Sequence, residues 1–163
     1  MKILAQCQAS VEPETRRALA QLARAAVGQA LRHGGVLGAT ETGVLFTDDV
    51  RMRELNRDFR HIDRPTDVLA FAMREDAEGE RPAGVPAAGE LLGDIVISLD
   101  TARRQAAARG HSLRREVAVL LVHGALHLIG YDHPASPEGR QEARTMRVAE
   151  RACLSALEEA LIL

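Results

Sequence analysis

The chain has 163 residues, a length that suits one domain, and its 46% hydrophobic and 27% charged residues exclude a largely disordered protein. A formal net charge of −2 excludes a strong overall attraction to nucleic acid, so an anionic partner must bind a local basic patch. Cys7 and Cys153 lie far apart and outside any C-x-x-C pair, which indicates neither a disulfide framework nor a cysteine zinc site. We therefore interpret residues 1–163 as a single domain.

The first half of the chain predicts two strands that alternate with two helices. Residues 2–9 have β character, and residues 12–32 place apolar side chains on one helical face, namely Leu19, Leu22, Ala23, Ala26, Val27 and Ala30. Residues 44–46 predict the next strand. Thr47 or Asp48 can then cap a helix that continues to about residue 58.

The second half predicts two more strands and three more helices. Residues 67–71 and 93–99 are predicted as strands, and the Gly-, Pro- and acid-rich residues 74–89 between them are typical of an exposed loop. Ser98 or Asp100 caps a helix that Gly110 ends, Ser112 opens the next helix, and a final helix runs to about residue 161. This order predicts an α+β fold in which a small mixed β-sheet packs with helices.

Residues 123–133 carry the strongest chemical signal, because His123, His127 and His133 are spaced to converge on one transition metal. Four residues of α-helix turn the chain through about 400°, so the first two imidazoles leave the helix about 40° apart. Gly130 stands where a helix commonly ends in a left-handed residue, and the reversal can bring His133 toward the same ion. Three nitrogen ligands leave an open coordination position, as in catalytic zinc sites.

The residues before the first histidine support a metal site. Residues 117–122 are apolar all round, which predicts a largely buried helix, and burial favours the neutral imidazole that binds metal. The alternative is a set of hydrogen-bonded core histidines. A three-histidine site favours hydrolysis, because its metal activates water and polarises a carbonyl or phosphoryl oxygen.

The motif has the spacing H-x-x-x-H-x-x-G-x-x-H of the metzincin proteases, but Gly124 stands where they have the Glu that serves as general base. The missing carboxylate disfavours peptide hydrolysis. Phosphodiester cleavage depends more on charge stabilisation, for which arginine is suited because its fork binds phosphate oxygens bidentately. Residues 55–71 supply such arginines, at positions 57, 60 and 64.

Two further segments, residues 55–71 and 93–98, help to identify a protein family when they are considered together with the histidine motif. Together with Leu-His-Leu-Ile-Gly-Tyr-Asp-His at 126–133, they resemble the YbeY family of bacterial rRNA maturation endoribonucleases. The resemblance covers most of the chain, from about residue 48 to residue 157. The histidine spacing with Gly in place of Glu is highly specific for this family.

The resemblance implies that His123, His127 and His133 bind one zinc ion and that Arg60 is a functional arginine, which we interpret as a phosphate ligand. It further implies a single-strand-specific endoribonuclease that acts on rRNA of the small ribosomal subunit, in 16S rRNA 3′-end maturation and ribosome quality control. Three Phe, one Tyr and no Trp offer few stacking platforms for bases. Recognition of the RNA backbone and shape is therefore favoured.

Several polar residues allow two interpretations each. Arg60 is either a phosphate ligand or a solvated charge at a helix end. Asp94 orients a ligand histidine or has a turn or capping role, and Glu116 orients a ligand histidine or forms a plain ion pair. Asp132 only shapes the turn before His133. The remaining basic residues of this region either extend an RNA-binding patch or form solvated helix faces, namely Arg103, Arg104, Arg109, Arg114 and Arg115.

Two rival functions stand beside the endoribonuclease. One is a metalloprotease, which Gly124 disfavours, and the other is a non-catalytic ribosome-assembly factor with a structural metal and RNA-binding arginines. The N-terminal residues turn polar too soon for a signal-peptide core, and no apolar run is long enough to span a membrane. We therefore expect a cytoplasmic protein that binds RNA, with neither a membrane nor DNA as a partner.

Overall fold

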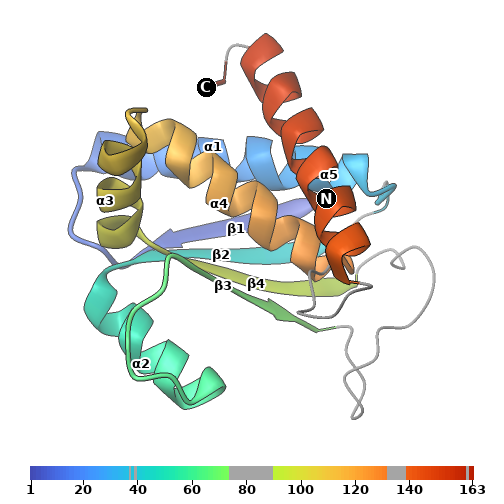
Figure 1. Ribbon diagram of the computed structural model, residues 1–163. Coiled ribbons are helices and arrows are strands. Elements are labelled where there is room, and N and C mark those ends of the chain that lie inside the picture. Colours follow the sequence, from blue (N-terminus) through green and yellow to red (C-terminus); the bar gives the residue numbers. More distant parts are fainter. Residues whose placement is uncertain (37, 39, 74–89, 132–138, 161) are drawn as a thin grey trace.

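The computed structural model describes residues 1–36, 38, 40–73, 90–131, 139–160 and 162–163. Within these residues the elements follow the order β1-α1-β2-α2-β3-β4-α3-α4-α5, which confirms the predicted order (Figure 1). The predicted loop at 74–89 lies outside the described residues, as do residues 132–138 before the final helix. None of the described helices is long and apolar enough to cross a membrane.

The sheet has four strands in the order β1-β2-β4-β3, and it is mixed, as predicted. β1 (Lys2–Cys7), β2 (Glu41–Thr47) and β4 (Leu91–Ser98) run parallel, whereas β3 (Val68–Ala72) pairs antiparallel with β4. α1 (Pro13–His33) makes the crossover that a parallel β1–β2 pair requires. β3 is consequently an edge strand of this sheet.

One face of the sheet is covered by helices. Val44, Phe46, Ile95 and Ile97 point to this face and are buried. α1 and α4 (Leu113–Leu128) lie over them, and α5 (Gly139–Glu159) packs against both helices (Figure 1). An apolar stripe of α5 is buried at Met146, Ala149, Cys153 and Leu157, whereas Ala160 follows the end of the helix and is exposed.

The opposite face of the sheet is only partly covered, by α2 (Asp49–Arg60). Met52 of this helix packs with Leu69 and Val96, which are also buried. Because successive strand residues point to opposite faces, Val96 belongs to this small core and its neighbour Ile95 to the large one. A groove of about 580 Å³ remains beside α2, and Phe59 at its wall is 64% exposed.

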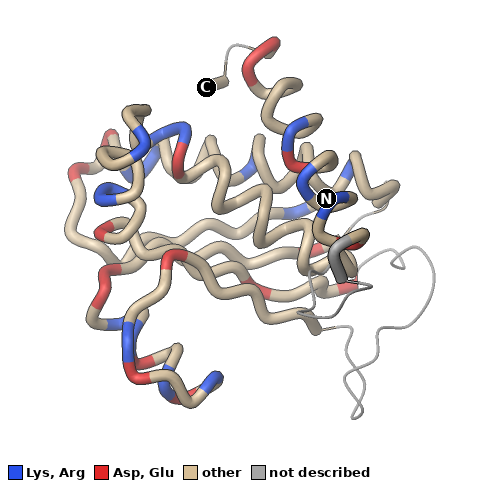
Figure 2. The backbone as a smooth tube through the Cα atoms, in the orientation of Figure 1, with Lys and Arg blue, Asp and Glu red and all other residues tan. Residues whose placement is uncertain are grey.

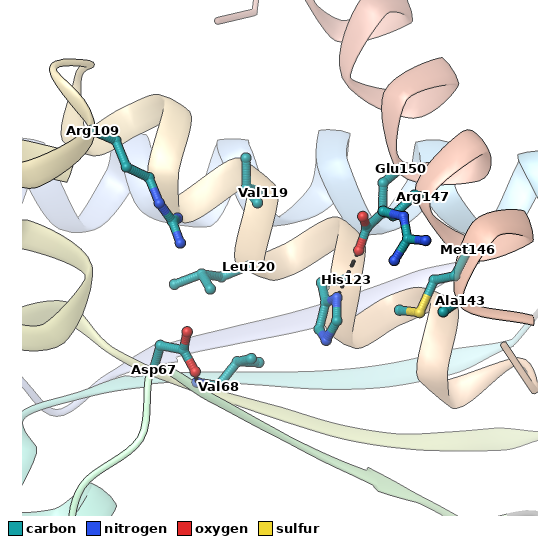
Figure 3. A pocket seen from close by; sticks show the side chains of 10 residues that line it. All are labelled: Asp67, Val68, Arg109, Val119, Leu120, His123, Ala143, Met146, Arg147 and Glu150. Carbon is teal, nitrogen blue, oxygen red and sulfur yellow. Dashed lines mark hydrogen bonds and ion pairs between the residues drawn. The ribbon is translucent and has the colours of Figure 1, made fainter. Parts of the chain in front are cut away.

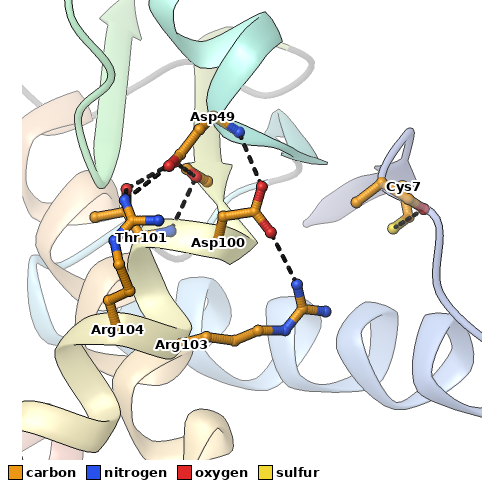
Figure 4. A network of polar contacts seen from close by, with 8 residues as sticks. Cys7, Asp49, Asp100, Thr101, Arg103 and Arg104 are labelled. Atoms are coloured by element: carbon orange, nitrogen blue, oxygen red, sulfur yellow. Dashed lines mark hydrogen bonds and ion pairs between the residues drawn. The ribbon is translucent and has the colours of Figure 1, made fainter.

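Polar contacts join the beginning of α2 to the beginning of α3 (Leu99–Arg109), as Figure 4 shows. Asp49 Oδ1 accepts hydrogen bonds from Ser98 Oγ at 2.5 Å and from Thr101 Oγ1 at 2.7 Å, and Asp49 Oδ2 pairs with Arg104 at 2.7 Å. Burial alone raises the pKa of the Asp49 carboxyl, but these donors outweigh it and lower the pKa. The network therefore holds α2 against the covered part of the molecule.

Three helices begin at capping residues that the sequence predicts. The side chains of Asp48, Ser98 and Ser112 each accept a hydrogen bond from the backbone N–H three residues later. α3 ends at Gly110 with φ 68°, and Gly130 with φ 98° follows α4. The predicted helix ends at these two glycines are thus confirmed.

Candidate functional site

α4 carries the first two predicted ligands close to the sheet. The helix is buried as predicted, and Gly124 faces residues of β3 and β4. A Cβ atom at Gly124 would lie 2.9 Å from Ile95 Cγ2 and 3.4 Å from Val68 Cγ2. The missing side chain therefore allows a close approach that fixes His123 and His127 against the edge of the sheet.

The imidazoles of His123 and His127 face each other. Their Nε2 atoms are 3.1 Å apart and their ring planes are inclined by 78°. On the other side of its ring, His123 Nδ1 lies 2.7 Å from Oε1 of Glu150, a residue of α5. A carboxylate in this position holds the imidazole proton on Nδ1, so Nε2 is the atom with a lone pair to donate.

The two Nε2 atoms fit two ligands of one zinc ion. Nitrogens about 2.05 Å from a tetrahedral zinc lie about 3.3 Å apart, close to the observed 3.1 Å. The Glu150 carboxylate is the kind of partner that metal-binding histidines commonly have. Among the residues that the structure describes, no three His, Cys, Asp or Glu side chains lie together as a metal site, and His133 is outside those residues.

A cavity of about 350 Å³ lies beside His123, between α4, α5 and the beginning of β3 (Figure 3). Its charged lining comes from Asp67, Arg109, Arg147 and Glu150, and its apolar lining from Val68, Val119, Leu120, Ala143 and Met146. The His123 side chain is 28% exposed. A substrate in this cavity would therefore meet the imidazole that Glu150 orients.

The structure decides between the interpretations of Glu116 and Asp94. Glu116 is fully buried and pairs with Arg109 and with His111, whose Nε2 is 2.6 Å from Glu116 Oε2, so it is an ion-pair partner. Asp94 is exposed and lines the groove beside α2, on the face of the sheet opposite α4. Neither carboxylate orients a ligand histidine within the described residues. Asp132 lies outside them.

Arg60 is the last residue of α2 and is exposed. It does not line the cavity beside His123, and α2 packs on the other face of the sheet from α4. The structure therefore does not bring Arg60 together with the two histidines. Within the described part of the chain Arg60 makes no side-chain hydrogen bond or ion pair, whereas Arg57 pairs with Asp58 at 3.0 Å and Arg53 with Asp63 at 2.6 Å.

The five arginines of α3 and of the start of α4 that could extend an RNA-binding patch are held by protein partners. Arg103 pairs with Asp100, Arg104 with Asp49, Arg109 with Glu116 and Arg115 with Glu158, and Arg114 donates to the Ile162 carbonyl. Figure 2 shows basic and acidic residues interleaved on these helices. A continuous basic patch at these five arginines is therefore absent from the described structure, although Arg109 also reaches the cavity beside His123.

Glu150 is the site residue that the sequence interpretation missed. It lies four residues after Met146 and three before Cys153, at the border of the apolar stripe of α5. A carboxylate beside a buried stripe needs a polar partner, which is a signal that the sequence does contain. Its partner, however, is on another helix, and the pairing of α4 with α5 cannot be read from helical periodicity.

Comparisons with known proteins agree with the motif. The family described as Endoribonuclease YbeY matches residues 5–158. Relatives named Endoribonuclease YbeY include those of Moorella thermoacetica, 51% identical over 67% of this chain and 73% of the relative, and Roseiflexus castenholzii, 47% identical over 85% and 83%.

A similar fold is found in the solution structure of TM1509 from Thermotoga maritima. Its TM-score is 0.54 at 21% identity, with 98% of this chain and 94% of that chain covered. The likeness supports the α+β architecture. The match of the family over nearly the whole chain, with relatives near 50% identity, shows that the chain belongs to the endoribonuclease YbeY family.

Proposed function

We propose that this protein is a zinc-dependent endoribonuclease that cleaves single-stranded RNA beside His123 and His127. Membership of the family makes it a hydrolase of RNA phosphodiester bonds with a role in rRNA maturation. The observation that carries the metal proposal is the pair of Nε2 atoms 3.1 Å apart, one of them on a ring oriented by Glu150. The finer role is 16S rRNA 3′-end maturation and ribosome quality control in the cytoplasm.

His123, His127 and His133 would hold one zinc ion, and Glu150 would fix the tautomer of His123. Such an ion supplies a Lewis acid that polarises a phosphoryl oxygen and makes water a nucleophile at neutral pH. The remaining residues bind and position the RNA. Arg60 contributes a free guanidinium for an RNA phosphate, which its lack of a partner among the described residues supports.

The rival functions are less consistent with the structure. A metzincin-like protease needs a carboxylate after the first histidine, and position 124 has no room for one against Ile95. An assembly factor with a structural metal would have a closed coordination shell. His123 instead borders a cavity, which favours a catalytic metal.

The proposed function is tested with purified wild type, His127→Ala and the control His33→Ala, whose exposed histidine lies at the end of α1. We expect about one zinc per chain in wild type and control, and loss of both zinc and RNA cleavage in His127→Ala. Metal analysis and cleavage of a single-stranded RNA, with its duplex for comparison, measure this. Full zinc without cleavage in the wild type would favour the assembly factor, and equal zinc in all three proteins would remove the metal site.

A further inference from the structure

The cavity beside His123 contains two arginines that the proposed chemistry does not yet use. Figure 3 shows Arg109 at one end of the cavity, and Arg147 with His123 and Glu150 at the other. Arg109 comes from the end of α3 and Arg147 from α5. Residues distant in the sequence therefore present two guanidinium groups to one small space next to the histidine pair.

The carboxylates of the cavity are already engaged with protein donors. Glu150 accepts from His123 Nδ1 at 2.7 Å. Asp67 accepts from Gln105 Nε2 at 2.9 Å and from the Val68 backbone N–H at 2.8 Å. Burial raises the pKa of Asp67, but these hydrogen bonds outweigh it and lower the pKa, so the carboxylate is ionised and is held by neutral donors of the protein.

The two arginines, in contrast, keep N–H donors available for a ligand. Arg147 is exposed and makes no side-chain hydrogen bond or ion pair with any residue that the structure describes. Arg109 is anchored by the fully buried Glu116, yet its own side chain remains 52% exposed. A guanidinium has five N–H donors, so this one ion pair leaves Arg109 with donors for a ligand.

We propose that this cavity is a phosphate-binding subsite for single-stranded RNA, in which Arg147 beside the histidine pair and Arg109 at the opposite end each bind a backbone phosphate near the bond that is cleaved. The assignment rests on the proposed endoribonuclease function. Arginine forks match phosphate oxygens, and the apolar walls at Val68, Leu120 and Met146 suit the carbon atoms of a ribose. Contact to the RNA backbone needs no aromatic platform, and among the described residues that line the cavity His123 alone has an aromatic ring.

The test compares Arg147→Gln with Arg144→Gln, both in metal-loaded protein. Arg144 is an exposed arginine of the same helix that does not line the cavity. Kinetics on a short single-stranded RNA give kcat and KM at several salt concentrations, and fluorescence anisotropy of the same labelled RNA gives its affinity. Bound zinc and the melting temperature of each variant are also measured.

We expect Arg147→Gln to raise KM about fivefold with little change in kcat, because an exposed ion pair contributes up to about 1 kcal/mol equally to bound substrate and transition state. The salt dependence of log affinity should become shallower by about 0.7, the value for one phosphate of a single strand. Arg144→Gln should match the wild type. Arg109→Lys, which keeps the charge that neutralises buried Glu116, should also raise KM because ammonium lacks the fork.

Three other results would contradict the phosphate subsite or the proposed function. If Arg147→Gln and Arg144→Gln give the same KM and the same salt dependence, while the wild type cleaves RNA, the phosphate subsite is wrong and the proposed function stands. If the wild type neither binds nor cleaves RNA, the proposed function fails and the subsite fails with it. A fall in kcat and in bound zinc for Arg147→Gln would show that Arg147 supports the metal centre instead.

Discussion

The two faces of the sheet are built from alternating residues of the same strands, yet they differ in how they are used. The covered face packs Ile95 and Ile97 under α4, which holds His123 and His127 with their Nε2 atoms 3.1 Å apart. The other face packs Val96 and Leu69 under the single helix α2 and leaves an open groove. The two histidines, whose atoms must keep a fixed distance, are therefore carried by the helix that packs against the sheet, α1 and α5, and not by the helix beside the open groove.

The largest effect that tests this difference between the two faces is expected at Arg60, which lies on the face with the open groove. We expect Arg60→Lys to lower kcat on single-stranded RNA about 100-fold if its fork binds the reacting phosphate, as removal of an oxyanion-hole donor does. Bound zinc and melting temperature should stay unchanged, since Arg60 is exposed and is no metal ligand. Such a result would mean that residues from both faces act in one site.

Arg57→Lys is the matched control for Arg60, because Arg57 lies on the same helix and pairs with Asp58. It should cleave RNA like the wild type. A rise in KM alone for Arg60→Lys would place its phosphate contact away from the reacting bond. Wild-type cleavage by Arg60→Glu would contradict any role and leave Arg60 as a solvated helix-end charge.

The next largest effect is a loss of zinc affinity, expected on the helix-covered face of the sheet when Glu150 is replaced. Removing the carboxylate that orients a metal-binding histidine typically weakens metal affinity about 10- to 100-fold. We expect this range for Glu150→Ala, and a smaller loss for Glu150→Gln, whose amide oxygen can still accept from His123 Nδ1. Competition with a chelator measures the zinc affinity directly. Glu158→Gln, exposed on the same helix, is the control, and equal affinity in Glu150→Ala and the wild type would disprove the orienting role.

Glycine substitutions compare the packing of the two faces. In Gly124→Ala the new methyl group meets buried Ile95, and overpacking that costs about 2 kcal/mol exceeds the gain of about 1 kcal/mol from alanine in a helix. We expect a net loss of about 1 kcal/mol in the free energy of unfolding, measured by denaturant titration. In Gly43→Ala on the open face, the methyl group meets the exposed Asp94 carboxylate, which can turn away, and we expect a change within about 0.5 kcal/mol.

Gly28→Ala in α1 is the helical control, because its methyl group would have only ordinary contacts, the nearest being Arg32 at 3.4 Å. It should gain stability by up to about 1 kcal/mol from helix propensity alone. If Gly124→Ala were stabilising to the same extent, α4 would not be tightly packed on the sheet. The contrast between the two faces would then be wrong.

The smallest expected effect is the acid response of Asp67, at the edge where the two faces meet. Its pKa is lowered, since hydrogen bonds from Gln105 and Val68 outweigh the effect of burial. A lowered carboxyl pKa contributes stability above the unfolded value of about 3.9, and the contribution is lost as the pH falls through the folded value. Melting temperatures should therefore fall below about pH 4 in the wild type and fall less steeply in Asp67→Asn. Equal slopes in the two proteins would contradict the lowered pKa.

The sequence predicts the large features of the molecule because they depend on local patterns. Element order, the caps at Asp48, Ser98 and Ser112, and the meeting of His123 with His127 all follow from residues within one helix or strand. The positions of Arg60 and Glu150 do not. They depend on which face of the sheet α2 occupies and on how α5 crosses α4. Both are features of tertiary packing, which hydrophobic periodicity does not determine.

The same dependence on tertiary packing explains why the roles of Glu116 and Asp94 stayed open in the sequence. Helical spacing places Glu116 on the side of α4 that also bears His123, but two turns of helix separate them, and the nearer Arg109 and His111 bind the carboxylate. Strand alternation could have assigned Asp94 to the face opposite Ile95, since neighbours in a strand point in opposite directions. The role of His133 stays a prediction.

The contact between His123 and Glu150 can form only late in the synthesis of the chain. α4 and its two histidines are synthesised before α5, so a nascent chain that ends before residue 150 has both imidazoles but no carboxylate to orient His123. During translation this contact can form only after α5 has been synthesised and has docked on α4. The orientation of a side chain on α4 thus depends on a residue that is added to the chain 27 residues later.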